Sequence, residues 1–167
     1  MDPGGILALD LASTVGWAYG PIVSEGATPT CGAWILPNIG GIGAKCAAFE
    51  NELLDSISLF QPSHIVMEAA LPAKAQSSQW SAEAAIGLSC YAQGTAYRHD
   101  IDISKISALT VRKVILGRGT FPKGEAKDFV QAFCREQGWR FPTHDAADAL
   151  VTWLYASRRI SVGHRVA

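Results

Sequence analysis

Residues 6–14, ILALDLAST, form an apolar run that contains one carboxylate, Asp10. The composition around Asp10 is typical of a buried strand. An unpaired, ionised carboxylate in an apolar interior costs several kcal/mol, roughly, even after the surroundings relax. We therefore expect Asp10 to reach water, a partner or a metal ion, depending on what other residues come together around it.

The length and composition fit one globular domain. The chain has 167 residues, of which 49% are hydrophobic and 17% charged, so it can bury a core and is not typical of a disordered protein. We expect a single domain over residues 1–167. The apolar runs are too short to cross a membrane and the N-terminus has no secretory signal pattern, which favours a cytoplasmic protein.

The cysteines and the charges limit the classes of function that the chain can have. Cys31, Cys46, Cys90 and Cys134 are widely spaced and form no zinc-binding pattern, so we expect small buried core residues in a reducing compartment. The net charge of -1 conceals two halves of opposite sign. Residues 1–104 have three basic and ten acidic residues, and residues 105–167 have eleven basic and five acidic residues. This asymmetry is compatible with an acidic site in one half and a phosphate-facing surface in the other.

The hydrophobic pattern predicts an α/β fold. The predicted strands cover residues 5–11, 15–19, 31–37, 64–70 and 101–107, and the predicted helices cover residues 44–60, 79–97, 108–116 and 125–137. A last helix begins at Pro142 and Thr143, with Thr143 as its N-cap. Because the strands come first as a meander and then alternate with helices, we expect a five-stranded mixed sheet flanked by helices on both faces.

Three more acidic residues stand out. Glu68 lies near the end of another apolar strand, and in open α/β sheets ligand chemistry lies outside the carboxyl ends of the strands. Asp145 and Asp148, in the segment THDAADAL, are three residues apart and therefore share one face near the start of the last helix. If the elements are neighbours, these carboxylates meet Asp10.

Each acidic position also has an ordinary explanation. Asp145 could complement the helix dipole, and Asp148 could belong to a solvated stripe with Thr152, Tyr155 and Arg159. The two strand carboxylates could simply face solvent. Taken together, however, oxygen ligands on regular elements suit Mg²⁺ or Mn²⁺. Two such ions can activate a water and stabilise the leaving oxygen of a phosphodiester, and they offset the repulsion among the carboxylates.

The segments ILALDLASTVGWAY, HIVMEAALP and HDAADALVTWLY, in this order within residues 5–157, resemble the RuvC-type Holliday junction resolvases of the RNase H-like superfamily. DAADAL is the most specific of the matching parts. The resemblance implies an RNase H-like nuclease with a catalytic, metal-binding tetrad of Asp10, Glu68, Asp145 and Asp148. It also implies two Mg²⁺ ions per site and a homodimer that nicks two strands of a four-way DNA junction symmetrically. In that dimer the helix over residues 79–97, rich in small residues, lies near the interface.

A basic, glycine-rich segment supplies the predicted DNA contacts. Its glycines leave the backbone open to phosphates, although a solvated face with a flexible loop is the alternative. The candidates are Lys105, Arg112, Lys113, Arg118, Lys123 and Lys127. Lys123 resembles, in its place before the penultimate helix, the active-site lysine of the family. The resemblance implies that it is catalytic and neutralises phosphate charge in the transition state.

Some assignments stay open at the level of sequence. Leu71 and Trp80 are the candidates for a residue that inserts into the junction, with core packing as the alternative for Trp80. His144 is a loop or capping residue, or else a proton carrier or phosphate contact. The rival functions are a nuclease acting on other branched DNA or on ribosomal RNA precursors, a phosphotransferase of the sugar kinase and actin class, and a non-catalytic DNA-binding module.

Overall fold

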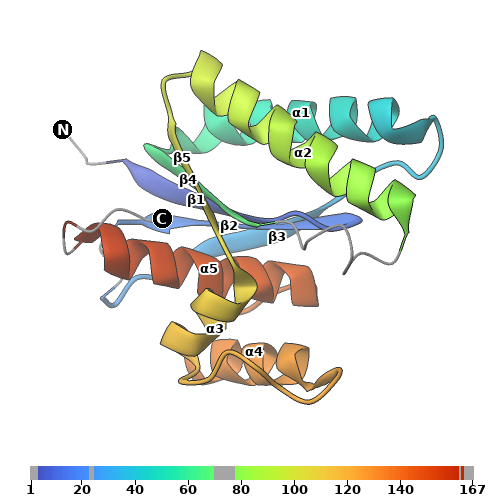
Figure 1. Cartoon of the computed structure of the whole chain (residues 1–167). Helices are drawn as coiled ribbons and strands as arrows, with labels where there is room; N and C mark the ends of the chain where they lie inside the picture. Colours follow the sequence, from blue (N-terminus) through green and yellow to red (C-terminus); the bar gives the residue numbers. More distant parts are fainter. Residues whose placement is uncertain (1–3, 23–24, 70–77, 162, 164–167) are drawn as a thin grey trace.

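A computed structural model describes residues 4–22, 25–69, 78–161 and 163 (Figure 1). The five strands and five helices expected from the sequence are all present. In chain order they are β1 (Gly5–Asp10), β2 (Thr14–Pro21), β3 (Thr30–Ile35), α1 (Gly41–Phe60), β4 (His64–Glu68), α2 (Gln79–Arg98), β5 (Asp102–Ile106), α3 (Ala108–Ile115), α4 (Glu125–Glu136) and α5 (His144–Ser161). Among the described helices, none is both long and apolar enough to span a bilayer.

The strands form one mixed sheet in the order β3-β2-β1-β4-β5. β2 is antiparallel to β1 and β3, whereas β4 is parallel to β1 and β5. Helices α1 and α2 make the crossovers that parallel neighbours require, and they cover one face of the sheet (Figure 1). α5 covers the other face, with α3 and α4 outside it (Figure 1). The predicted α/β fold, a five-stranded mixed sheet between helices, is confirmed.

The central strand β1 is buried on both faces, which explains its continuous apolar run. Ile6 and Ala8 belong to the core cluster under α5, and Leu7 and Leu9 belong to the cluster under α1 and α2. Because side chains alternate along a strand, Asp10 follows Ile6 and Ala8 to the α5 face. The apolar pattern of the strand therefore decides on which side its carboxylate lies.

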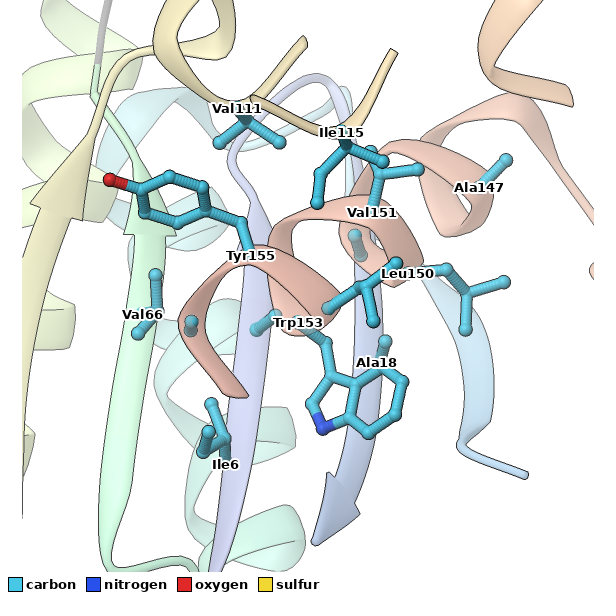
Figure 2. Close-up of a cluster of buried hydrophobic side chains, with 14 of the residues drawn as sticks. Ile6, Ala18, Val66, Val111, Ile115, Ala147, Leu150, Val151, Trp153 and Tyr155 are labelled. Atoms are coloured by element: carbon cyan, nitrogen blue, oxygen red, sulfur yellow. The ribbon is translucent and has the colours of Figure 1, made fainter. Parts of the chain in front are cut away.

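α5 is the central helix of the core cluster shown in Figure 2. Its residues are buried without interruption from Asp145 to Ser157, because the sheet covers one side and α3 and α4 cover the other. The alternative that placed Asp148 in a solvated stripe is therefore wrong. The predicted N-cap is confirmed, because the Thr143 hydroxyl accepts a hydrogen bond of 3.1 Å from the Ala146 N–H.

The four cysteines are free thiols, but they do not share one environment. Cys46 and Cys134 are buried and Cys31 is half-buried, whereas Cys90 is exposed on α2. The expectation of buried core cysteines is therefore wrong for Cys90, because it lies on the outer face of the helix and not on the face toward the sheet.

Candidate active site

Two of the acidic residues end neighbouring parallel strands. Asp10 is the last residue of β1 and Glu68 is the last residue of β4. Leu9 pairs with Met67, so the two carboxylates occupy the next position on each strand, side by side. Val66 lies in the core cluster under α5, and alternation brings Glu68 to the same face. Both carboxylates therefore lie at the end of the sheet that the start of α5 approaches.

Gly16 allows α5 to approach this end of the sheet closely. It is the register partner of Asp10 on β2, and a Cβ atom at this position would clash with the backbone carbonyl of Asp145. A strand residue without a side chain lets another backbone come this close. The glycine-aromatic pattern of the second strand thus has a physical reason, because it allows the first turn of α5 to lie directly beside Asp10.

The two helical carboxylates are buried and already face basic side chains. Asp145 is 8% exposed and Asp148 is 6% exposed. Asp145 Oδ1 lies 3.0 Å from His144 Nε2, and Asp148 Oδ1 lies 3.7 Å from Arg112 Nη2 on α3. His144 is the first residue of α5, so the structure places it within the helix and in contact with a site residue.

The carboxylates act on one another electrostatically. Burial raises the pKa of Asp10 well above its ordinary value, and the charges of Glu68, Asp148 and Asp145 raise it further. Burial, followed by the charge of Asp148, raises the pKa of Glu68 to about 7. Burial also raises the pKa of Asp148. Crowded negative charge in a buried place favours either protonation or a bound cation.

Two basic side chains oppose this repulsion. Lys127, in the first turn of α4, lowers the pKa of every carboxyl group whose pKa is raised here. Arg112 lowers the pKa values of Glu68 and Asp148. Lys123 is exposed and is not among the charges that shift these pKa values. The sequence pattern missed Lys127 as the facing lysine, because the orientation of α4 depends on its packing against α5.

The structure brings the four carboxylates together without arranging a finished metal-binding group. Among the described residues, no three His, Cys, Asp or Glu side chains are placed so that they could hold one metal ion. Asp145 and Asp148 are instead paired with His144 and Arg112. The donor set itself fits a divalent cation, since it consists of carboxylate oxygens that repel one another.

The predicted DNA contacts do not form one uniform patch. The Arg112 side chain is largely buried and is paired with Asp148, so its guanidinium is not a free phosphate contact. Lys105 lies on the α2 face of β5, because Ile103 belongs to the core on that face and alternation places both on the same side. These two residues therefore depart from the predicted surface.

The remaining candidates are exposed on α3, on the loop that follows it and on α4. They are Lys113, Arg118, Lys123 and Lys127. The Arg118 guanidinium carbon lies 4.4 Å from the ring centroid of Phe121 and 5.4 Å from that of Phe129. Stacking on two phenyl rings holds this guanidinium at the surface of the loop.

Leu71 and Trp80 are the two candidates for a residue that inserts into a DNA junction, and the structure describes only one of them. Leu71 lies outside the described residues. Trp80 is 44% exposed at the start of α2, so core packing is wrong for it. Its ring instead lies 5.2 Å from Lys45 Nζ on α1.

The small residues of α2 serve packing within the protein. Ala92 and Ala96 lie in the core, and a Cβ atom at Gly87 would lie 2.9 Å from Cys46 Sγ on α1. The outer face of the same helix carries large apolar side chains, which include Ile86 and Tyr97. Any partner on this helix therefore meets large side chains and not the small ones.

No protein-family model matches the chain, and no curated protein matches it in sequence. Solved structures are similar to it over most of its length. RuvC from Thermus thermophilus has a TM-score of 0.72 at 15% identity, and the match covers 95% of this chain and 96% of that chain. T. thermophilus RuvC in complex with a Holliday junction substrate has a TM-score of 0.75 at 12% identity, with the same coverage of 95% and 96%.

The yeast mitochondrial Holliday junction resolvase Ydc2 has a TM-score of 0.64 at 12% identity, over 94% of this chain and 80% of that chain. At such low identities the likeness concerns the path of the backbone. The chain therefore has the fold of these RuvC structures, as its three motifs predict.

Proposed function

We propose that the protein is a metal-dependent endonuclease that resolves four-way DNA junctions by symmetric phosphodiester hydrolysis. One observation carries the proposal. In a RuvC-type fold, β1, β4 and α5 deliver Asp10, Glu68, Asp145 and Asp148 to one end of the sheet, where their charges repel one another. The similar structure of RuvC with a Holliday junction substrate supports the choice of DNA substrate.

The four carboxylates would hold two divalent ions, Mg²⁺ or Mn²⁺, which when bound activate a water and stabilise the leaving oxygen. The residues around the four carboxylates make the site suitable for cations. Because burial and neighbouring charges raise the pKa values of Asp10 and Glu68, a cation would compete with protons for these two carboxylates. His144 and Arg112 hold the two helical carboxylates in place, and the carboxylate oxygens of Asp145 and Asp148 would be ligands for the ions.

Lys127 takes the role that the family resemblance gave to Lys123. Its charge acts on Asp10, Glu68 and Asp148, so it lies near the place where a phosphate would be cut. A lysine there neutralises charge that develops on the phosphate in the transition state. Lys123 and the stacked Arg118 would contact the DNA backbone outside the site.

Symmetric cleavage needs two sites, and we assign the dimer contact to the outer face of α2. Ile86, Cys90 and Tyr97 are spaced by four and seven residues, share this face and are exposed. Uncovered apolar side chains on one helix face are typical of an interface between protein chains. A thiol-specific bifunctional reagent should therefore join two copies through Cys90, whereas Cys90→Ser should remain uncoupled.

The decisive experiment compares synthetic four-way junctions, forks, duplex DNA and structured RNA, each with Mg²⁺ and with a chelator. We expect paired nicks at symmetric positions in the junction when Mg²⁺ is present, and no nicks when the chelator replaces it. Faster cleavage of forks or RNA would instead favour the alternative, a nuclease for other branched DNA or ribosomal RNA precursors. The free thiols support a reducing, cytoplasmic setting for this activity.

A further inference from the structure

Lys45 is a buried cation with no carboxylate partner among the described residues. It lies in the second turn of α1 and is 1% exposed. Its Nζ atom has no hydrogen-bond partner among the described residues, and it lies 5.2 Å from the ring centroid of Trp80. An aromatic ring compensates only part of the free energy that burial of an ammonium group costs. Such a group is completed by an anion.

The surroundings of Lys45 favour an anion as well. A lysine in the second turn of a helix leans back toward the first turn, and the contact with Trp80 places its ammonium beside the start of α2. The first turns of α1 and α2 contain no acidic residue, and the N-cap Gly40 makes no side-chain hydrogen bond to α1. The Ser78 hydroxyl caps α2 by accepting a 3.1 Å hydrogen bond from the Ser81 N–H, so the N–H groups without a side-chain cap are those of α1. These groups and the positive ends of the two helix dipoles join the ammonium.

The starts of the two helices lie close together at the catalytic end of the sheet. Cys46 faces Gly87, and one turn later the Glu50 carboxylate accepts a 3.1 Å hydrogen bond from the Thr95 hydroxyl, so α1 and α2 run in the same direction. In Figure 1 both helices begin at the end where β1 stops and where α5 begins. Lys45 and the carboxylates thus lie at one end of the sheet but on opposite faces.

The first turn of α1 is open to solvent at its glycines. A Cβ atom at Gly41 or Gly43 would meet nothing within 4 Å. Lys105, on the same face of the sheet near the end of β5, is exposed and adds a positive charge to this side. A ligand with several negative oxygens fits such a place better than a single carboxylate, because free N–H groups and an ammonium can then be bonded together.

We propose that the starts of α1 and α2 form a phosphate-binding site, in which Lys45 and the free N–H groups of the first turn of α1 bind one phosphate group beside Trp80. The site is separate from the carboxylates. The phosphate belongs either to a DNA strand or to free phosphate. Phosphate binding stands by itself, whereas DNA as its source rests on the proposed function.

The first test is thermal unfolding of the full chain with increasing inorganic phosphate, at constant ionic strength and with a chelator. We expect phosphate to raise the unfolding temperature of the wild type. Lys45→Met should unfold at a higher temperature than the wild type in phosphate-free buffer, because the unpaired ammonium is gone, and it should not respond to phosphate. Arg158→Met, which removes an exposed charge near the other end of α5, should keep the response.

A second pair of variants avoids the buried position. Gly43 is the third residue of α1 and its φ is not positive, so a side chain fits there. Gly43→Asp supplies a carboxylate to the free N–H groups, and we expect it to stabilise the protein and abolish the phosphate response. Gly43→Asn has the same shape without the charge and should keep the response.

Junction DNA then distinguishes the two sources of phosphate. If the phosphate belongs to DNA, Lys45→Met weakens junction binding and lowers the slope of log K against log salt by about one. If it is free phosphate, the thermal response is lost while junction binding is unchanged. The proposal is overturned if phosphate does not stabilise the wild type, or if Lys45→Met and Gly43→Asp respond to phosphate like the wild type. A failure of the proposed function would appear instead as a wild type that nicks no junction.

Discussion

The two faces of the sheet bury opposite charges at the same end. Under α5, burial and the neighbouring carboxylates raise the pKa values of Asp10, Glu68 and Asp148. The basic side chains there, Lys127, Arg112 and His144, compensate part of the repulsion. Under α1 and α2, Lys45 lies next to Trp80 without an acidic partner among the described residues. The charges on the first face favour binding of cations, and those on the second face favour binding of an anion.

This difference arises from the two-residue alternation of a strand that is buried on both sides. Leu9 and Asp10 are neighbours in sequence, yet one belongs to the core under α1 and α2 and the other faces α5. Groups of opposite charge can thus lie at one end of the sheet, on its opposite faces. Substitutions of charged residues on the two faces should therefore have different effects.

Asp10→Asn should have the largest effect, since it removes a central carboxylate of the α5 face. We expect no detectable cleavage, with junction binding unchanged or tighter because repulsion of the phosphates falls. Nicking and gel-shift assays on folded protein measure both quantities. The control is Asp55→Asn, an exposed carboxylate on α1, which should cleave normally. Loss of binding together with loss of folding would give Asp10 a structural role instead.

Lys127→Ala should lower the cleavage rate of bound junction by more than about tenfold, roughly 1.4 kcal/mol, because its charge lies at the carboxylates. Lys123→Ala should keep that rate but weaken binding, with a salt dependence reduced by about one phosphate contact. Single-turnover kinetics at saturating enzyme, repeated at several salt concentrations, separate the two. The reverse pattern would return the catalytic role to Lys123.

The stability of the metal-free protein should fall as pH rises from about 4.5 to about 7. Glu68 has an ordinary pKa of 4.5 when unfolded and about 7 in the fold, so the folded state binds more protons in this range. The loss is about 1–3 kcal/mol, and Mg²⁺ should restore it at pH 8. Urea unfolding in chelator measures this change. Glu68→Gln should show a weaker pH dependence and exposed Glu52→Gln should not, so identical curves for both variants would contradict the assignment.

Arg118→Lys should have the smallest effect. The charge remains but stacking on Phe121 and Phe129 is lost, so we expect junction binding about two- to fivefold weaker, or ~0.5–1 kcal/mol, at an unchanged salt slope. Arg118→Ala should in addition reduce the slope. Equal affinity of Arg118→Lys and the wild type in a fluorescence titration would show that the rings do not position the guanidinium for DNA.

Much of the fold and the grouping of the acids could be predicted from the sequence, because both depend on local patterns. The continuous apolar run in ILALD predicts a buried strand, and the i, i+3 spacing of Asp145 and Asp148 places them on one helix face. Gly16 marks a close approach of another backbone, although only the structure identifies that backbone as α5.

The basic residues could not be assigned in the same way. Lys127 rather than Lys123 faces the carboxylates because of the orientation of α4, which depends on packing between distant segments. Lys45 precedes the buried Cys46 in an amphipathic helix, and its own burial depends on the start of α2. Arg112 appeared as a phosphate contact, since no local pattern connects it with Asp148, which lies 36 residues later.

The position of α5 late in the chain has a consequence for biosynthesis. Asp10 and Asp148 are 138 residues apart, and the N-terminal part of a chain leaves the ribosome first. A growing chain that has completed β1 and β4 has only two of the four carboxylates, and it lacks the helix around which the core of Figure 2 packs. The candidate site is therefore complete only when residues 144–161 have been made and have packed against the sheet.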